Sequence, residues 1–337
     1  MSFHVGACQG ELRDMTSVWA AYQDALGAIE GQIKKGVDSE VPLINQVAHY
    51  TLSSGGKRIR PLLLAISARL CGCADQNAIQ IGGAIVEFIH TATLLHDDVM
   101  DDAKVRRGAP AARSLWGNHA CILVGDYLYT LAICQAARLE SVAVNYLFAR
   151  TCGKMSEGET LQLMHNDDFD LSEETYLKIV SYKTASLLSA ACHLGGILAD
   201  VPNAQQNALA DFGQHMGVAF QVADDTLDYI ADGKRLGKAP GQDFREGKIT
   251  LPLLHFLRHC TPAQRQEMKR LMEDPSLSSA QFSEIVRQMD RQGSIAYALQ
   301  RAQEFATLAK SALSVFDDSQ DRQSLMTVAD YVVQRDH

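Results

Sequence analysis

The sequence predicts an all-α protein in which long helices pack into one bundle. Apolar residues recur at the three- and four-residue spacing of an amphipathic helix from about Thr16 almost to the C-terminus. The chain has only 8 prolines in 337 residues, and they stand mostly between the periodic segments, which favours long helices. No stretch alternates apolar and polar residues as a half-buried strand does, and no convincing hairpin turn is present.

The composition narrows the class of protein and its compartment. Hydrophobic residues make up 47% of the chain and charged residues 21%, so the chain can form a large core and global disorder is not expected. A formal net charge of −9 argues against a nucleic-acid binder. The 8 cysteines are scattered without two close pairs at zinc spacing, and we interpret them as reduced, buried side chains of a cytoplasmic protein.

The chain is expected to form a single large domain. Residues 1–14 lack a strong helical period and are interpreted as an N-terminal lead that need not be ordered. Residues 15–337 contain no linker rich in glycine, serine and proline, so we expect one all-α domain of about a dozen helices around one core.

Local signals mark several helix starts and two apolar helices. The predicted starts are Ser172 followed by two glutamates, Asn203 with Gln206, and Thr261-Pro262 with Gln264. Residues 120–139 contain Asp126 and residues 185–201 contain His193, so neither is a clean run of about 18–20 apolar residues. Both are expected to be buried helices rather than membrane spans, with Asp126 a satisfied polar residue of the core.

A long apolar helix within residues 85–102 is predicted to end in an acidic cluster of Asp97, Asp98 and Asp101. Residues four apart share a helix face, so Asp97 and Asp101 point the same way. Two such carboxylates repel each other unless a cation lies between them. Mg²⁺ is the natural occupant, because it takes one or two carboxylates and fills its shell with water and phosphate oxygens. Taken alone, the cluster is equally compatible with a solvated helix end.

The same D-D-x-x-D spacing returns at Asp224, Asp225 and Asp228, again after an apolar helix. Asp224 and Asp228 share one helix face, and Gln221 lies on the same side one turn earlier. Two such motifs, each at the end of an apolar helix, point to metal ligands on two walls of one site with an apolar interior beneath it.

Three basic segments accompany the acidic ones. Residues 55–61 place Lys57 and Arg60 where a helix begins, which suits a phosphate group. Residues 104–110 form a turn that carries two arginines directly after the first acidic cluster. Residues 232–250, rich in glycine and cations, are interpreted as a lid over bound phosphates. Lys183 is expensive to bury without an anion, and by itself it is ambiguous between the core and a site.

With these motifs together, the sequence resembles the trans-polyprenyl diphosphate synthases of the long-chain, octaprenyl type. The resemblance covers roughly residues 45–255, in the family's order. It is carried by G-G-K-R-I-R-P, E-F-I-H-T-A-T-L-L-H-D-D-V-M-D, R-R-G, G-D-Y-L, K-T, F-Q-V-A-D-D-T-L-D and G-K-x-x-G-x-D-x-x-x-G-K-x-T-L-P. It implies an isoprenoid-synthase-type bundle of about ten core helices around a deep central cavity. A homodimer is also implied.

The resemblance also implies roles for individual residues. Asp97, Asp101 and Asp224 would hold Mg²⁺, about three ions with substrate bound and replaceable by Mn²⁺, with Asp98, Asp225 and Asp228 in support. Around the allylic diphosphate it implies Arg106 and Lys183, with Thr184, Gln221 and Lys238 nearby. Around isopentenyl diphosphate it implies Lys57, Arg60, His90 and Arg107.

The implied reaction joins isopentenyl diphosphate to an allylic diphosphate such as farnesyl or geranylgeranyl diphosphate. The allylic C–O bond breaks, the isopentenyl double bond attacks the allylic cation, and a proton is lost. No dedicated side-chain base is evident, so the departing diphosphate is expected to accept the proton. A dry apolar cavity is needed because water would quench the cation. The lipophilic product would be handed to the membrane, and a quinone side chain is its expected use by family analogy.

Two small residues one turn below Asp97, Ala92 and Thr93, are expected to leave the product tunnel open. In this family a small pair is associated with products beyond C20, so the expected product is C30–C50, with C40 the central value. The helix that contains Tyr127, Leu128, Leu131 and Ile133 is expected to supply the tunnel floor. An Ala92→Phe change would then shorten the product to about C15–C20.

Three rival functions are open at this stage. A class I terpene cyclase also ionises an allylic diphosphate, but it usually has a different second metal motif and needs no second diphosphate site. A non-catalytic subunit of a heteromeric synthase tends to lose the aspartates, which are intact here. An HD-type phosphohydrolase at His96-Asp97 would need further histidine ligands at suitable positions.

Overall fold

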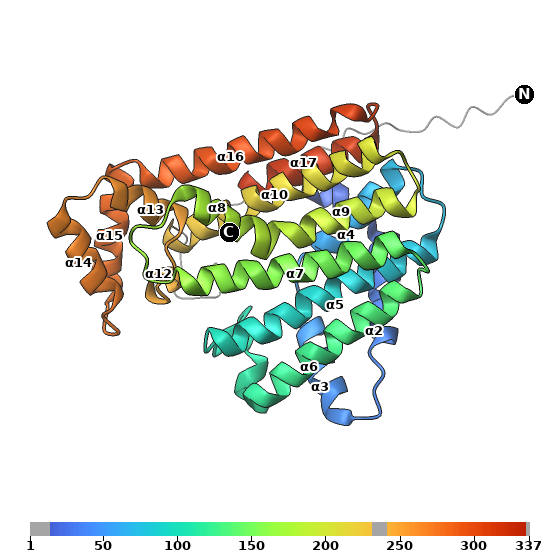
Figure 1. Ribbon diagram of the computed structural model, residues 1–337, viewed down its shortest axis with the longest axis horizontal. Coiled ribbons are helices and arrows are strands. Elements are labelled where there is room, and N and C mark those ends of the chain that lie inside the picture. Colours follow the sequence, from blue (N-terminus) through green and yellow to red (C-terminus); the bar gives the residue numbers. More distant parts are fainter. Residues whose placement is uncertain (1–13, 231–240, 335–337) are drawn as a thin grey trace, which may run out of the picture.

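The computed structural model describes residues 14–230 and 241–334, and their regular structure is almost entirely helical (Figure 1), which confirms the all-α prediction. The helices from the first half of the chain are α1 (Met15–Ala21), α2 (Gln23–Gly36), α3 (Pro42–Ser53), α4 (Ile59–Leu70), α5 (Gln76–Met100), α6 (Ala112–Ala137) and α7 (Val142–Met164). Those from the second half are α8 (Glu173–Val180), α9 (Ser186–Leu198), α10 (Asn203–Ile230), α12 (Gln242–Arg245), α13 (Leu251–Arg258), α14 (Pro262–Met272), α15 (Ser279–Arg291), α16 (Ser294–Ala312) and α17 (Gln320–Gln334).

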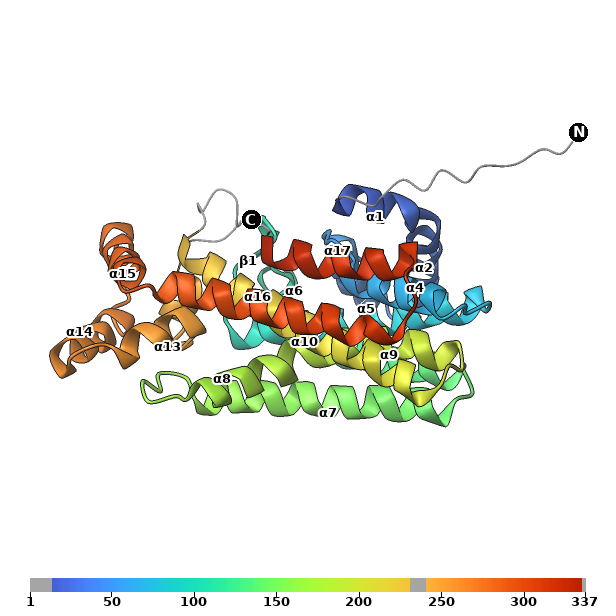
Figure 2. The same cartoon turned by 90° about the horizontal axis from the view of Figure 1, so that it is seen from above.

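Helix α9 lies at the centre of the bundle, because it packs against α4, α5, α7 and α10. On one side of it, α5 packs against α2, α4 and α6, and on the other side α10 packs against α16 and α17. The short helices α13–α15 project together at one end of the molecule, as Figures 1 and 2 show. The ends of α5 and α10 that carry the acidic motifs therefore belong to two layers on either side of α9.

Helix α5 places the first acidic motif by its length and its caps. The Asp75 side chain accepts a hydrogen bond from the Ala78 N–H at 2.9 Å and starts the helix, as N-caps do. The helix ends where the Asp101 N–H donates to the Asp97 carbonyl at 2.8 Å. Between these ends the buried side chains are mostly apolar, so the aspartates come last, at the mouth of an apolar layer.

Helix α10 approaches α9 closely at Gly217. A Cβ atom on Gly217 would lie 2.6 Å from the Ala185 Cα, a distance that real Cβ atoms essentially never show. This close approach brings the second acidic motif alongside residues 181–185, which form a π-helical turn just before α9. Such turns are rare and frequently occur at functional sites.

The predicted turn over residues 104–110 is a small β-hairpin, which the sequence did not reveal. Strands β1 (Val105–Arg106) and β2 (Ala109–Pro110) pair antiparallel, with Arg106 opposite Ala109. Arg107 and Gly108 connect them with φ of 52° and 77°. Positive φ at both positions is the geometry of a two-residue hairpin turn, but Arg-Gly is not one of its strong sequence signals.

Helices begin at all three predicted starts, but only two of them have the predicted cap. Ser172 accepts from the Thr175 N–H, and Thr261 forms the expected capping box with Gln264. Asn203 is the first residue of α10 and therefore not its cap. The preceding Pro202 carbonyl accepts the first helical N–H groups, and the Gln206 side chain donates to the Val201 carbonyl instead.

Near the N-terminus, Asp14 caps α1 by accepting from the Ser17 N–H at 2.8 Å, so this residue belongs to the helical region rather than to the lead. Residues 1–13 lie outside the described part of the chain.

The two apolar segments differ in burial. Helix α9 is buried as predicted, but α6 is not: Leu123 and Ile133 expose 67% and 66% of their surface. Asp126 on α6 is also no core residue, because 63% of its side chain is exposed. Helices α5 and α6 are both long and apolar enough to cross a membrane, although α5 is largely buried inside the bundle.

The described cysteines are all free thiols, as predicted. Their burial is less uniform than expected, because Cys134 on α6 is exposed.

Candidate active site

A cavity of about 700 Å³ opens between α5, α6, α7, α9 and α10, and both acidic motifs reach it. Asp97 lines it from the end of α5 and Asp224 from the end of α10. Its charged and polar lining includes Arg60, Arg106, Arg107, Lys183, Thr184 and Gln221. The structure therefore brings together the two helix ends that the sequence predicted to face each other.

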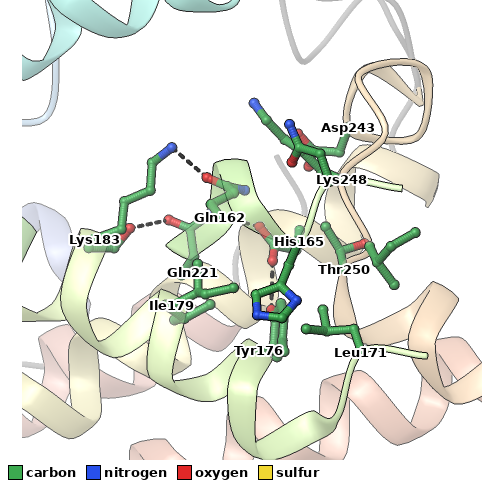
Figure 3. A pocket seen from close by; sticks show the side chains of 15 residues that line it. Gln162, His165, Leu171, Tyr176, Ile179, Lys183, Gln221, Asp243, Lys248 and Thr250 are labelled. Atoms are coloured by element: carbon green, nitrogen blue, oxygen red, sulfur yellow. Dashed lines mark hydrogen bonds between the residues drawn. The ribbon is translucent and has the colours of Figure 1, made fainter. Parts of the chain in front are cut away.

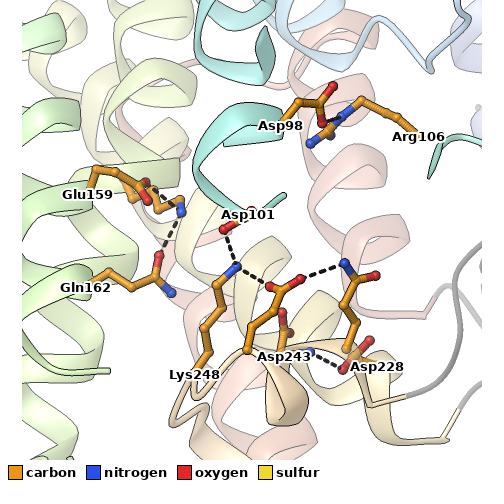
Figure 4. Close-up of polar contacts among 11 residues, drawn as sticks. Asp98, Asp101, Arg106, Glu159, Gln162, Asp228, Asp243 and Lys248 are labelled. Atoms are coloured by element: carbon orange, nitrogen blue, oxygen red, sulfur yellow. Dashed lines mark hydrogen bonds and ion pairs between the residues drawn. The ribbon is translucent and has the colours of Figure 1, made fainter. Parts of the chain in front are cut away.

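In the first motif, Asp97 faces the cavity and Asp98 lies behind it. Asp98 is 1% exposed and accepts a hydrogen bond from the Arg106 Nε at 2.5 Å (Figure 4). Burial raises the pKa of Asp97 to about 6, with Glu159 and Asp101 adding to the rise while Lys183 and Arg106 oppose it. The cavity therefore holds a carboxylate whose charge is poorly compensated by the protein alone.

Asp101 is the third acid of that motif, and it lies next to Lys248. The Lys248 Nζ is 3.3 Å from Asp101 and 2.7 Å from Glu246 (Figure 4). Burial alone would lower the pKa of Lys248, but these carboxylates raise it above its ordinary value. Lys248 lies in the second half of the predicted lid segment, residues 232–250, so a cation of that segment reaches the first acidic helix end.

In the second motif, Asp224 lines the cavity, whereas Asp225 and Asp228 are buried behind it. Asp225 accepts from the Tyr176 hydroxyl at 2.6 Å and from the Gln221 Nε2 at 2.7 Å. Burial raises the pKa of Asp225 to about 6, although both hydrogen bonds oppose the rise. Asp228 accepts the Asp243 N–H at 3.0 Å and so anchors the segment that begins at residue 241.

Lys183 and Thr184 stand on the π-helical turn beside Gln221, in the region that Figure 3 shows from close by. The Lys183 Nζ is 2.6 Å from Glu159 and 2.7 Å from the Gln162 Oε1. The Thr184 hydroxyl donates to the Gln221 Oε1 at 2.8 Å. Gln221 therefore links Thr184 in the cavity wall to the buried Asp225.

A second, smaller cavity of about 310 Å³ adjoins the first and is strongly basic. It is lined by Lys57, Arg58, Arg60, Glu87, His90 and Arg107, and it shares Arg60, His90 and Arg107 with the larger cavity. Burial lowers the pKa of Arg60 to about 10, and the nearby Arg107 adds to this. Burial followed by Arg60 and Arg107 also lowers the pKa of His90 well below its usual value, so His90 is neutral at pH 7.

Comparison with known proteins then decides the family. The family model described as polyprenyl synthetase matches residues 41–289. This is a polyprenyl synthetase family member. The chain is 42% identical over 314 residues to the octaprenyl diphosphate synthase of Escherichia coli, covering 93% of this chain and 96% of that enzyme. It is 36% identical over 320 residues to the nonaprenyl diphosphate synthase of Mycobacterium tuberculosis, covering 94% and 95%.

The fold of the family member agrees with a solved structure. It superposes with a TM-score of 0.91 on a polyprenyl synthase from Caulobacter crescentus complexed with calcium and isoprenyl diphosphate. That protein is 38% identical, and the match covers 95% of this chain and 97% of that one. The chain is therefore an enzyme, a long-chain trans-prenyltransferase that uses prenyl diphosphates, and the cyclase and non-catalytic readings are not favoured.

For the predicted tunnel residues, the polyprenyl synthetase structure gives a mixed result. Thr93 lines the larger cavity, but Ala92 is fully buried in the core beside it and is not part of the lining. Below the aspartates the described lining is instead Thr93, His96, Ile122, Tyr129, Met155 and Leu187. The predicted floor residues on α6 do not line this cavity within the described chain, and Ile133 points to the outside.

Two residues of the site were not predicted from the sequence, and one predicted residue lies outside the described part of the chain. Glu159 and Tyr176 were not predicted as site residues. Each joins the site through a contact with a residue distant in sequence: Glu159 pairs with Lys183, and the Tyr176 hydroxyl donates to Asp225. The repeated acidic and amide residues after Met155 on α7 were the available signal for Glu159. Lys238 lies outside the described residues, as does the rest of the basic loop up to residue 240.

The front carboxylates fit a hard divalent cation. Asp97 and Asp224 line one cavity, and Asp97 is an acid whose charged form burial disfavours. Within the described residues, no three His, Cys, Asp or Glu side chains form a ready metal cage. Mg²⁺ suits such a set, because it takes few carboxylates and leaves its other positions to water and phosphate oxygens.

Proposed function

We propose that this enzyme condenses isopentenyl diphosphate with farnesyl or geranylgeranyl diphosphate and repeats the addition to an all-trans C40 product. The observation that carries the proposal is the pair of adjoining cavities, one lined by both acidic motifs and one lined by cations. Two diphosphate groups need two such places, one for the leaving group and one for the group that stays on the product. The E. coli relative is an octaprenyl diphosphate synthase, which supports C40 within a C30–C50 range.

We assign the residues as follows. Asp97, Asp101 and Asp224 would hold Mg²⁺, about three ions with substrate bound, and Mn²⁺ is expected to substitute. Asp98, Asp225 and Asp228 fix the front acids from behind. The allylic diphosphate would lie against Arg106 and Lys183, with Thr184, Gln221 and Lys238 nearby. The isopentenyl diphosphate would lie against Lys57, Arg60, His90 and Arg107.

In the proposed mechanism the protein orients two diphosphates and keeps water out. Bound Mg²⁺ would neutralise the negative charge that builds on the oxygens of the leaving diphosphate. Arg106 and Lys183 complete that electrostatic environment, and both are already anchored, by Asp98 and by Glu159. The neutral His90 can donate one hydrogen bond without adding charge. The apolar lining around Leu187 and Met155 protects the allylic cation, and the departing diphosphate accepts the proton.

Thr93 is proposed to keep the tunnel open below Asp97, and this gives a test of product length. Thr93→Phe would place a ring in the cavity and should shorten the product from C40 to about C15–C20. Ala92→Phe should instead destabilise the fold, because overpacking a filled core typically costs about 1–3 kcal/mol. Chromatography of the products of both variants checks this, and an unchanged product from a folded Thr93→Phe enzyme contradicts the tunnel assignment.

We further propose that two copies associate through α6 and the start of α7. Large apolar side chains are exposed along this surface, among them Leu123, Ile133, Val142 and Tyr146. A second copy would cover them, which is the common reason for a contiguous exposed apolar surface. Light scattering should give twice the chain mass, and Leu123→Glu should reduce it toward one chain.

The remaining proposals concern organisation and place. Residues 15–337 are proposed to act as one domain, which the packing of α9 against helices from both halves of the chain supports. The enzyme is proposed to work in the cytoplasm and to hand its product to the membrane, where a forty-carbon tail partitions strongly. A quinone side chain remains the proposed use of the product.

The activity is tested by mass spectrometry of the products that the pure chain makes from labelled isopentenyl diphosphate, farnesyl diphosphate and Mg²⁺. The expected result is a C40 diphosphate, absent when isopentenyl diphosphate is omitted. A hydrocarbon or alcohol formed from farnesyl diphosphate alone would identify a cyclase. No turnover without a second protein would identify a subunit of a heteromeric enzyme.

A further inference from the structure

The basic cavity contains one arginine that faces away from a prospective ligand. Arg58 lies between Lys57 and Arg60, but its guanidinium binds three acceptors of the protein. It pairs with Glu87 on α5, lies 3.1 Å from the Glu30 carboxylate on α2, and donates to the Leu52 carbonyl on α3 at 2.7 Å. All of its visible contacts are therefore to the fold, across three helices.

The backbone at Arg58 is held in an unfavourable conformation. Arg58 has φ of 44° and ψ of 37°, the left-handed region, which is uncommon for residues other than glycine. Gly55 and Gly56 just before it also have positive φ, and a Cβ on Gly56 would lie 2.9 Å from the Arg107 guanidinium. Such strain persists only where the surroundings fix it and is concentrated at ligand sites.

Glu87 is the reason why this arginine is needed. It is 3% exposed, it lines the basic cavity, and it lies one helical turn before His90. Its charge is felt by both Arg60 and Arg107, whose pKa values burial lowers and Glu87 partly restores. Without a partner of its own, a buried carboxylate at this place would draw these two cations toward itself.

Arg60, by contrast, keeps an unsatisfied donor. Its Nε atom is buried and has no hydrogen-bond partner among the described residues. Buried polar groups are nearly always paired, so an unpaired guanidinium nitrogen in a cationic cavity indicates an anion that is bound there in the working enzyme. Glu87, the one carboxylate in the described lining of this cavity, is paired with Arg58 instead.

We propose that Arg58 is a positioning residue of the isopentenyl diphosphate site. It neutralises the buried Glu87 and thereby leaves Arg60 and Arg107 available to the diphosphate. This inference rests on the proposed assignment of the basic cavity to isopentenyl diphosphate. Arg58 itself does not contact the substrate.

The test is a double-mutant cycle on Arg58 and Glu87, read by calorimetry of isopentenyl diphosphate alone and by steady-state KM and kcat. Arg58→Gln should weaken isopentenyl diphosphate binding about tenfold or more, because it frees a buried carboxylate to compete for the cations. Adding Glu87→Gln to it should restore binding to within about threefold of wild type. The KM for the allylic substrate should change much less in both variants.

Arg58→Lys keeps a positive charge beside the buried Glu87 and should bind within about threefold of wild type. If Arg58→Gln does not fold, this variant and the double variant are used for the test. Arg69→Gln is the matched control, because it breaks an ion pair with Asp321 at the other end of α4. Its binding should equal wild type.

Each outcome separates the two proposals. A double variant that binds as weakly as Arg58→Gln means that Arg58 only holds the loop, and the inference is overturned. Unchanged binding in Arg58→Gln overturns it as well. Arg60→Gln tests the site itself: if this variant binds isopentenyl diphosphate as wild type does, the assignment of the basic cavity fails, whatever the cycle shows.

Discussion

The two acidic helix ends have the same spacing of aspartates but different surroundings behind them. At the end of α5, the rear acid Asp98 is paired with a cation, Arg106. At the end of α10, the rear acid Asp225 is held by two neutral donors, Tyr176 and Gln221. The front acids Asp97 and Asp224 nevertheless line one cavity. An aspartate that lines the cavity can therefore be backed by an ion pair, as in the first motif, or by neutral hydrogen bonds, as in the second.

This difference has a chemical consequence. Arg106 both supports Asp98 and lines the cavity, so the first motif brings its own positive charge to the site. The neutral support of the second motif ends in Thr184, which lines the cavity without charge. The two motifs therefore differ in the charge that their supports bring to the cavity, while their front acids line it alike.

The largest expected effect is on kcat, and it should be the same for the two front acids, Asp97 and Asp224. Asp97→Asn and Asp224→Asn should each lower kcat by about three orders of magnitude. Each removes a carboxylate that would hold Mg²⁺ against the negative charge that builds on the leaving diphosphate in the transition state. Steady-state kinetics with farnesyl and isopentenyl diphosphates measures this. A loss confined to one of the two variants would break the equivalence of the motifs.

The rear acids should differ in stability. Asp98→Asn leaves Arg106 without its anion in a half-buried place and should cost about 2–4 kcal/mol of unfolding free energy. Asp225→Asn keeps an acceptor for Tyr176 and should cost only about 1–2 kcal/mol. Urea unfolding of both variants measures the difference. Equal costs would mean that the nature of the support is unimportant.

The front acid of α5 gives a pH-dependent effect in metal-free protein. The folded-state pKa of Asp97 is raised to about 6, so its contribution to stability is lost as pH rises from about 4 to 6. Asp97→Asn should therefore raise the free energy of unfolding at pH 7–8 by about 1–3 kcal/mol, and the melting temperature with it. Below pH 4 the substitution should have little effect. Calorimetry in EDTA checks this, and destabilisation at pH 8 would contradict it.

The smallest effect concerns the neutral support. Tyr176→Phe leaves one Asp225 oxygen buried without its donor and should cost about 1–2 kcal/mol, with a modest rise in the allylic KM. Denaturation and steady-state kinetics measure both quantities. Tyr229→Phe serves as the control, because its hydroxyl binds Thr250 rather than an aspartate.

The sequence allowed the front of the site to be predicted, because Asp97 and Asp224 each end an apolar helix and periodicity fixes which face they share. It did not allow the supports to be predicted. Tyr176 reaches Asp225 from a separate helix, and Glu159 reaches Lys183 from another, so neither contact has a local signal. Ala92 is a related case. Ala92 and Thr93 are consecutive residues, about 100° apart around α5, and only Thr93 lines the cavity while Ala92 is buried beside it.

The central claim is that Asp97 and Asp224 hold one metal-bound allylic diphosphate between them. It is tested most directly by calorimetry with an unreactive thio-analogue of farnesyl diphosphate, with and without Mg²⁺, in wild type and both front-acid variants. The account predicts Mg²⁺-dependent binding in wild type that weakens about tenfold or more in Asp97→Asn and in Asp224→Asn. Binding that is equally tight without Mg²⁺, or unchanged in either variant, would contradict it.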